Sequence, residues 1–422
     1  MALQKLGLAT LGLVLLWAAL VAAATVEGWG RRPLAPPGDA RAFLDAAVAL
    51  VDAQQRGNAV LALLEDGAVF GEHAVSVGDP VDRDTVFQVA SLSKWITAWG
   101  VLALVEDGRL DLDAPIGRSL ARWQLPASEF DLDGVTPRRL LSHTAGLTDD
   151  LGYGGFAPGV QLQTLEQSLT RASDAFPGRG GEVRVGGAPG RGWRYSGGGY
   201  TLLQLLVEEV TGETFESYMQ RRVLQPLGMT RSTFEWTPER GTRLATFYDT
   251  DSRPATHFRF TALAAASLYT SVSDLTRFLQ AHLPGPDGAP IGRGVLEPET
   301  VRAMWRPQAS RLGREIWGLG ALLYARNGRG GFLVGHDGMN APAIYTTARL
   351  DPDGGDGIVV LETGTPLLAP QLGGEWVLWK TGETDVVTLV MRAPGALRIV
   401  AYGSLVIVAG ALVLGWRIRR GR

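Results

Sequence analysis

The residues in this chain best suited to covalent chemistry are Ser91 and Lys94, which lie three positions apart in the stretch Ser-Leu-Ser-Lys. A serine hydroxyl is a weak nucleophile until a base takes its proton. Residues three apart lie on the same face of a helix, so a lysine one turn beyond the serine can reach that hydroxyl. Ser93 is a competing candidate, because it could equally be the cap of the helix. Such a pair is common in helices, so the case for catalysis depends on the rest of the chain.

The segments around Ser91 predict a change from extended chain to helix at this point. Residues 84–90 are short, partly apolar and rich in β-formers, whereas residues 95–106 are apolar at helical spacing and stop at Asp107-Gly108. Ser91 is therefore expected at a helix N-terminus. Free N–H groups and a positive partial charge at that end favour a developing alkoxide.

The remaining pattern predicts a helix and a hairpin, then a long helical section, then a run of strands. The expected helices are residues 41–55 after a cap at Asp39, a helix from Pro137 after a cap at Thr136, one from about Tyr200 to Gly212, residues 215–224, and residues 275–282 after a cap at Ser273. The expected strands are residues 59–64, 68–77, 317–324, 332–335, 343–349 and 357–362. One antiparallel sheet made from the early hairpin and the late strands gives an α+β or three-layered fold. Helices flank this sheet, and the helical section, about residues 110–310, is an inserted subdomain.

Composition excludes several classes of protein and site. The 422 residues are enough for one large domain or two intimately packed ones, and the formal net charge is −3. Without a basic stripe and interleaved aromatic residues, nucleic acid is not an expected partner. The lack of cysteine excludes disulfides, thiolate metal sites and a cysteine nucleophile. The histidines show no ligand-like spacing, so no metal site is expected.

Both ends of the chain carry long apolar runs. The run from Leu6 to Val26 contains a cleavage-like pattern near its end, at Ala22-Ala-Ala24, so it fits a signal peptide or an uncleaved anchor. The run from Ile399 to Trp416 is followed by arginines, which favours a membrane span with a cytoplasmic tail. The predicted organisation is a signal peptide or anchor at 1–26, a linker at 27–38, a main domain at 39–385, a transmembrane helix at 396–416 and a basic cytoplasmic tail at 417–422. The main domain would then lie on the extracytoplasmic side of the cell membrane.

Five motifs occur in a defined order over roughly residues 40 to 365. They are Phe87-Gln-Val-Ala-Ser-Leu-Ser-Lys94, Leu140-Leu-Ser-His-Thr-Ala-Gly-Leu147, Arg194-Tyr195-Ser196, residues 261–279 with Tyr269-Thr-Ser-Val-Ser-Asp-Leu275, and Gly335-His-Asp-Gly338. With these motifs the chain resembles the serine β-lactamase and penicillin-binding protein superfamily, in its class C β-lactamase-like branch. That branch includes D,D-peptidases, D-aminopeptidases and family VIII carboxylesterases. The resemblance implies a β-lactamase/transpeptidase-like fold.

The resemblance also implies roles for the first three motifs. Ser91 would be the acylated nucleophile, and Lys94 would take part in its deprotonation. Tyr195 would match the tyrosine of the Y-x-N motif and act as general base or acid. A tyrosine can do so only if neighbouring cations such as Lys94 lower its pKa. His143 is expected to be structural and remote from the chemistry.

The last motif would match K-T-G, where this branch often has histidine in place of lysine. His336 would contribute a hydrogen bond or a positive charge beside the site. Gly338 would let the strand backbone approach the substrate closely. The backbone N–H groups of Met339 and Ser91 would form the oxyanion hole.

One position departs from the family pattern, because Gly197 replaces the asparagine of Y-x-N. In β-lactamases that side chain helps to hold the substrate amide. Its absence weakens a β-lactamase or acylamino-peptide interpretation more than an esterase interpretation.

The sequence therefore predicts a membrane-anchored serine hydrolase that forms an acyl-enzyme on an ester or a peptide-like amide, without a metal or organic cofactor. A β-lactamase or D,D-peptidase is the alternative among enzymes. A non-catalytic sensor or binding module, or a scaffold for a membrane partner, is the alternative of another class. The expected partners are a small-molecule or peptide-like substrate and the membrane, with specificity set by loops at 149–158 and 178–192.

Overall fold

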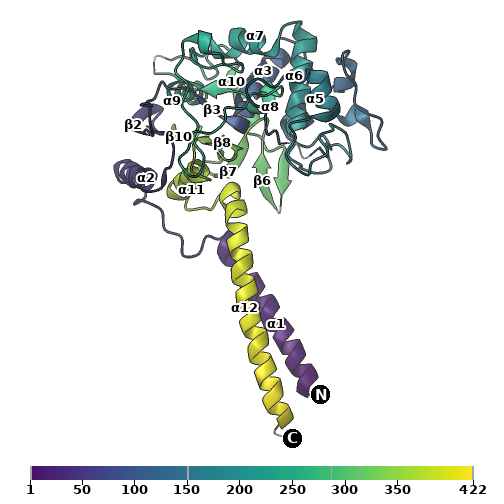
Figure 1. Ribbon diagram of the computed structural model, residues 1–422, viewed down its shortest axis with the longest axis vertical. Coiled ribbons are helices and arrows are strands. Elements are labelled where there is room, and N and C mark those ends of the chain that lie inside the picture. The colour runs from purple at the N-terminus through teal and green to yellow at the C-terminus, as the bar shows by residue number, and fades with distance from the viewer. Residues whose placement is uncertain (1, 150–151, 287, 312, 421–422) are drawn as a thin grey trace.

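A computed structural model describes residues 2–149, 152–286, 288–311 and 313–420. The central part of the chain folds around one large sheet, and two long helices project together from one end of it (Figure 1). These are α1 (Ala2–Val26) and α12 (Val386–Arg420), which pack against each other.

The described strands form one antiparallel sheet in the order β2-β1-β10-β9-β8-β7-β6-β5 and a small second sheet, β3-β4. The early hairpin thus joins the late strands through the β1–β10 pairing, as the sequence predicts. The strands are β1 (Ala59–Glu65), β2 (Ala68–Val75), β3 (Phe87–Gln88), β4 (Tyr269–Thr270), β5 (Ala309–Arg311), β6 (Arg314–Trp317), β7 (Leu322–Arg326), β8 (Phe332–Asn340), β9 (Ile344–Leu350) and β10 (Gly357–Glu362).

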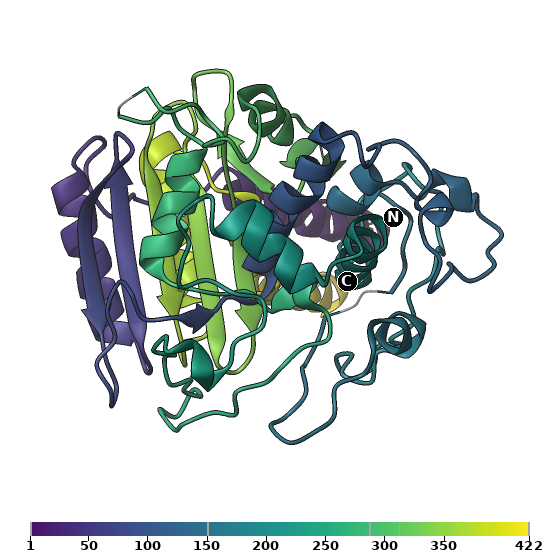
Figure 2. The same ribbon diagram turned by 90° about the horizontal axis from the view of Figure 1, so that it is seen from above.

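Helices cover both faces of the large sheet (Figure 2). The remaining α-helices are α2 (Ala40–Gln54), α3 (Ser93–Glu106), α4 (Pro137–Leu141), α5 (Leu165–Arg171), α6 (Gly197–Thr211), α7 (Phe215–Met219), α8 (Leu263–Ala266), α9 (Val272–Ala281), α10 (Pro298–Met304) and α11 (Leu368–Thr381). Short 3-10 turns are η1 (Ala90–Leu92), η2 (Ile116–Arg118), η3 (Leu132–Gly134) and η5 (Pro238–Arg240), and η4 (Gln220–Leu224) is a π-helix. Helices α2 and α11 pack on one face, and α3 and α9 pack on the other.

Alternation along β8 assigns its residues to the two layers, because successive strand side chains point to opposite faces. Val334 belongs to the core beneath α3, and Leu333 belongs to the core beneath α2 and α11. The predicted α+β fold with an inserted helical section is confirmed.

Several element boundaries differ from the predicted ones. For example, the helix expected from about Tyr200 begins at Gly197. The helix expected after Ser273 starts earlier, because Ser271 is the cap and accepts a hydrogen bond from the Asp274 N–H at 3.2 Å. The strand expected over 317–324 is two strands, β6 and β7, with a turn between them. The strand expected over 332–335 extends to Asn340, since its second half pairs with β9.

Candidate active site

Ser91 lies in η1, between β3 and α3, so the expected change from extended chain to helix is present. The helix itself begins at Ser93, two residues later than Ser91. Ala90, directly before the serine, has a φ of 47°, in the left-handed region that alanine rarely adopts. The tertiary structure therefore holds Ser91 on a strained, sharp turn with its side chain half-buried.

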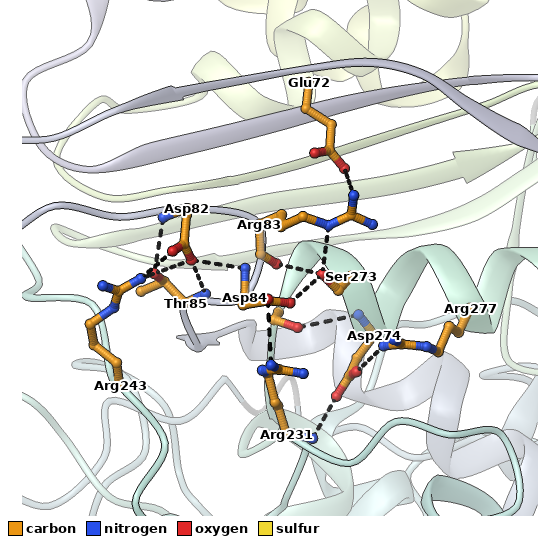
Figure 3. A network of polar contacts seen from close by, with 11 residues as sticks. Glu72, Asp82, Arg83, Asp84, Thr85, Arg231, Arg243, Ser273, Asp274 and Arg277 are labelled. Carbon is orange, nitrogen blue, oxygen red and sulfur yellow. Dashed lines mark hydrogen bonds and ion pairs between the residues drawn. The ribbon is translucent and has the colours of Figure 1, made fainter.

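A polar network holds the chain segment that leads into this turn (Figure 3). Arg243 donates to the Asp82 carboxylate at 2.6 Å and to the Thr85 hydroxyl at 2.8 Å. On the other side, the Ser273 hydroxyl donates to the Asp84 carboxylate at 2.6 Å. The entry to β3 is thereby tied to α9 and to the segment around Arg243.

Lys94 lies within reach of the serine hydroxyl, as its spacing predicts. Its Nζ is 3.2 Å from the Ser91 Oγ and donates to the Ala265 carbonyl at 2.6 Å. The side chain is buried, and this burial lowers the pKa of Lys94 to about 7, although Asp149 acts in the opposite direction. A lysine in this state is in part neutral near pH 7 and can accept a proton.

The competing candidate, Ser93, occupies a different environment. Its hydroxyl donates to the Ala90 carbonyl at 2.5 Å and accepts from the Leu268 N–H at 2.9 Å. The residue is fully buried. The Ser93 hydroxyl thus uses both its donor and its acceptor capacity to hold the turn.

Tyr195 lies beside the same two residues, but its protonation differs from the expectation. The Lys94 Nζ is 5.1 Å from the centre of the tyrosine ring. Burial raises the pKa of Tyr195 well above its usual value, and a hydrogen bond with Ser91 offsets only part of this rise. A lowered pKa, which is the condition for Tyr195 to act as a phenolate base, is therefore not met, because desolvation of the phenolate dominates.

The expectation that His143 is remote from these residues is also wrong. Its ring lies 4.3 Å from the Tyr195 ring and 4.6 Å from Trp317, centre to centre. Its Nδ1 accepts a hydrogen bond from the Ser196 N–H at 3.2 Å, and burial lowers the pKa of His143 well below its usual value. Sequence reasoning missed His143 and Trp317 as a platform for Tyr195. The only signal was the Ser-His-Thr motif itself.

His336 lies on β8 and faces the site, where it is 2% exposed. Burial and the charge of Lys94 lower the pKa of His336 to about 3, so the ring is neutral. Of the two expected contributions, a hydrogen bond or a positive charge, a neutral ring can supply only the hydrogen bond. Its Nδ1 is 2.6 Å from the Asp337 carbonyl, which can only accept, so Nδ1 carries the proton and Nε2 is an acceptor. Nε2 has no hydrogen-bond partner among the residues that the structure describes.

Gly338 brings β8 into close contact with the segment before Ser91. A Cβ at this position would lie 2.0 Å from the Val89 carbonyl oxygen and 2.4 Å from the Thr346 hydroxyl. Thr346 in turn donates to the same Val89 carbonyl at 3.1 Å. The next residue, Met339, directs its side chain to solvent. The chain therefore needs glycine at 338 to keep β8 packed against the segment directly before Ser91.

We expect Gly338→Ala to lower the free energy of unfolding by about 1–3 kcal/mol, because the added methyl must displace buried backbone. Gly117→Ala is the matched control, since a Cβ at that position meets no atom within 4 Å. The control should change stability by less than about 0.5 kcal/mol. Urea unfolding of both variants measures the difference, and equal stabilities would contradict the close approach.

Two cavities adjoin these residues. One of about 460 Å³ is lined by Trp193, Arg194, Tyr195, Ser310 and Arg311. The other, of about 330 Å³, lies at the β8–β9 turn and is lined mainly by apolar residues of 247–258 and 340–344. The predicted specificity loop at 178–192 does not line these two cavities, but together with Arg194 it lines a third cavity of about 710 Å³. Within the other predicted loop, 149–158, residues 150 and 151 lie outside the described residues. Among the described residues, no group of three or more His, Cys, Asp or Glu side chains could hold a metal ion.

Comparison with known proteins identifies the family. The model of the Beta-lactamase family matches residues 43–381. Penicillin-binding protein 4 of Amycolatopsis lactamdurans is 29% identical over 302 residues, which are 68% of this chain and 74% of that protein. Esterase EstB of Burkholderia gladioli is 35% identical over 162 residues, or 36% of this chain and 39% of the esterase. The chain thus spans about two fifths of EstB, and 37% of Penicillin-binding protein 4* of Bacillus subtilis.

Solved structures agree on the fold. The octameric penicillin-binding protein homologue from Pyrococcus abyssi superimposes with a TM-score of 0.65 at 23% identity, over 82% of this chain and 78% of that one. At this identity the likeness shows the fold alone. With the family match covering most of the chain and the five motifs gathered around Ser91, the chain belongs to the Beta-lactamase family.

Proposed function

We propose that this protein is a serine hydrolase that acts through an acyl-enzyme on Ser91, with an ester or a peptide-like amide as substrate. The observation that carries the proposal is the buried Lys94 amine, 3.2 Å from the Ser91 hydroxyl and with its pKa lowered to about 7. Burying a lysine amine is unfavourable for folding, and among the described residues no carboxylate lies within salt-bridge distance of Lys94, so a role in chemistry accounts for this lysine better than a structural role does.

In the proposed acylation, neutral Lys94 accepts the Ser91 proton as the Oγ attacks the substrate carbonyl carbon. The N–H groups of Ser91 and Met339 donate to the oxyanion of the tetrahedral intermediate. Collapse of this intermediate breaks the bond to the leaving group, which takes the proton. Water then attacks the acyl-enzyme carbonyl by the same route, which releases the acid and restores Ser91.

Tyr195 has a different role in this proposal from the one the sequence favours. Because burial keeps its phenol protonated, it does not act as a phenolate base. Its hydroxyl instead passes a proton from Lys94 to the leaving group, giving up its own proton as it receives another. His143 and Trp317 hold its ring in place. In neutral His336, the unprotonated Nε2 can accept a hydrogen bond beside Lys94.

The missing asparagine at Gly197 favours esters over β-lactams as substrates. Gly197 is the first residue of α6, directly after the cap Ser196. EstB is named as an esterase, and a protein of this fold from Ochrobactrum anthropi is named as a D-amino acid amidase, so both bond types occur among similar proteins.

We expect Gly197→Asn to raise kcat/KM for amide or β-lactam substrates by about tenfold, because one hydrogen bond to the substrate amide is gained. A chromogenic cephalosporin measures the change, with an ester of similar size as the reference substrate. If the variant gains nothing on the cephalosporin, the missing asparagine is not what limits amide turnover.

We further propose that α1 and α12 cross a membrane together as an antiparallel pair. Both helices are long and apolar, with mean hydropathies of 2.3 and 2.2 over their most apolar windows. Trp17 donates from Nε1 to the Ile399 carbonyl at 3.2 Å, and a Cβ on Gly403 would lie 2.0 Å from that nitrogen. Such a fitted contact gives α1 a structural role and favours a retained anchor over a cleaved signal peptide.

The arginines after residue 416 favour a cytoplasmic end of α12, which leaves the hydrolase domain on the extracytoplasmic side. A reporter enzyme that is active only outside the cytoplasm, inserted in the exposed loop at Gly288, should therefore be active. The same reporter fused after Arg422 should be inactive. The reverse pattern would overturn the proposed orientation.

The test of the enzymatic proposal is labelling of the detergent-solubilised protein by a fluorophosphonate, followed by mass mapping of the adduct. The expected result is one adduct, on Ser91 and not on Ser93. Labelling by fluorescent penicillin in parallel would favour the β-lactamase or D,D-peptidase alternative, and its absence would favour an esterase. Folded protein that takes no fluorophosphonate adduct would overturn the enzymatic proposal in favour of a sensor or binding module.

A further inference from the structure

Three buried charged side chains connect the strand of the active site to the first turn of α12. Asp337 stands between His336 and Gly338 on β8, and the alternation of the strand directs its side chain to the opposite face of the sheet. Each of its carboxylate oxygens accepts from the Arg349 Nη2 at 3.1 Å. Arg349, on β9, approaches Asp385 with its Nη1 at 3.4 Å. The side chains of Arg349 and Asp385 have no solvent exposure, and that of Asp337 is 14% exposed.

Asp385 stands directly before α12 and caps it. Its carboxylate accepts from the Val387 N–H at 2.8 Å, from the Thr388 N–H at 3.0 Å and from the Thr388 hydroxyl at 2.6 Å. A carboxylate at this position satisfies N–H groups that have no partner within the helix. The same side chain thus holds both Arg349 and the beginning of the helix that we propose crosses the membrane.

Helix α11 passes over these side chains at two adjacent glycines. A Cβ on Gly373 would lie 2.4 Å from the Arg349 Nε, and a Cβ on Gly374 would lie 2.1 Å from the Thr388 hydroxyl. Glycine inside a helix is unfavourable, so this pair has to be explained by the close approach. Figure 1 shows α12 leaving the domain beside α11 and β7.

We propose that Asp337, Arg349 and Asp385 are positioning residues for the reaction at Ser91. They clamp β8 to the start of α12, so that the His336 ring stays beside Lys94 and Gly338 stays against the Val89 carbonyl. Asp337 acts through its backbone as well, because its carbonyl accepts the His336 Nδ1 proton. The helix that anchors the protein is in this way part of the catalytic unit. The inference rests on the proposed function and adds residues that touch no substrate.

The test uses the full chain in detergent micelles, with p-nitrophenyl butyrate for kcat and KM and a fluorophosphonate for the rate of Ser91 labelling. Asp385→Asn keeps a capping side chain and removes the charge that faces Arg349. We expect kcat and the labelling rate to fall about tenfold while KM changes less than twofold, at a temperature where the variant is folded. Asp337→Asn is the second variant, and it should likewise lower kcat and the labelling rate while changing KM little.

Glu375→Gln is the matched control, because Glu375 lies on α11, as Gly373 and Gly374 do, but pairs with Arg31 at 2.7 Å and not with Arg349. It should leave the labelling rate unchanged. Since Asp337 and Asp385 act through the same arginine, the double variant should be no slower than the slower single variant.

Wild-type rates in both folded aspartate variants would overturn the inference and leave the enzymatic proposal intact. Loss of folding in both would overturn it as well, in favour of a purely structural role. An unlabelled wild-type protein would instead overturn the proposed function.

Discussion

Ser91→Ala is expected to abolish fluorophosphonate labelling and to reduce ester hydrolysis by on the order of 10⁴–10⁶-fold, the loss seen when a covalent nucleophile is removed. The fold should remain, because Lys94 keeps its hydrogen bond to the Ala265 carbonyl and Ser91 is only half-buried. A melting temperature within about 2 °C of wild type would show this.

Ser93→Ala is the matched control for the nucleophile. Its hydroxyl accepts from the buried Leu268 N–H, so its loss should cost about 1–3 kcal/mol of stability. Labelling of the folded fraction should nevertheless persist. A Ser91→Ala protein that is still labelled, or a folded Ser93→Ala protein that is not, would contradict the assignment of Ser91 as the nucleophile.

Lys94→Met is expected to slow acylation of Ser91 by about 10³-fold, the usual contribution of a general base. The substitution keeps a long side chain in the buried site but removes the group that accepts the proton. Because a buried amine is unfavourable and a buried thioether is not, the melting temperature should rise by a few degrees. The combination of a more stable and much less active protein distinguishes a catalytic lysine from a structural one. A lower melting temperature with retained activity would contradict the catalytic role of Lys94.

The pH dependence of the wild type follows from the same group. With its pKa lowered to about 7, Lys94 is mostly protonated below pH 7 and mostly neutral above it, so the labelling rate should rise with pH and level off above about 8. Between about pH 7 and 10.5 the unfolded chain binds a proton on this lysine that the folded chain does not. Stability should therefore increase with pH over that window. Lys94→Met should lack both effects, and an unchanged pH profile would assign the base elsewhere.

Local spacing sufficed to predict Ser91 and Lys94 as neighbours, because residues three apart meet on consecutive turns of one short segment. The hairpin of β1 and β2 and the cap Thr136 were predictable for the same reason, since turns and caps depend on a few adjacent residues. The cap of α9 was misplaced by two residues, because Ser273 is bound by Arg83 and Asp84, which are distant in sequence. A pattern along the chain contains no information on such partners.

Protonation states depended on burial, which the sequence does not show. Tyr195 was expected to act as a general base or acid, for which a lowered pKa is needed, and His336 was expected to contribute a hydrogen bond or a positive charge. In the structure both are enclosed, and desolvation favours their neutral forms. The packing of His143 against Tyr195 was hidden for a similar reason, because it needs a left-handed turn at His143 itself, with a φ of 58°.

The sequence by itself determined the family, the closeness of Ser91 and Lys94, the order of the elements and the two apolar helices, since all of these depend on residue types and short-range periodicity. Only the tertiary structure decided that Lys94 is in part neutral near pH 7, how Tyr195 is held, and that Arg349 lies between Asp337 on β8 and Asp385 at the start of α12. The physical reason is that desolvation and ion pairing act between side chains that strand pairing and helix packing bring together. The residues of the Asp337, Arg349 and Asp385 group come from two strands and a helix start, and no local pattern marks them as partners.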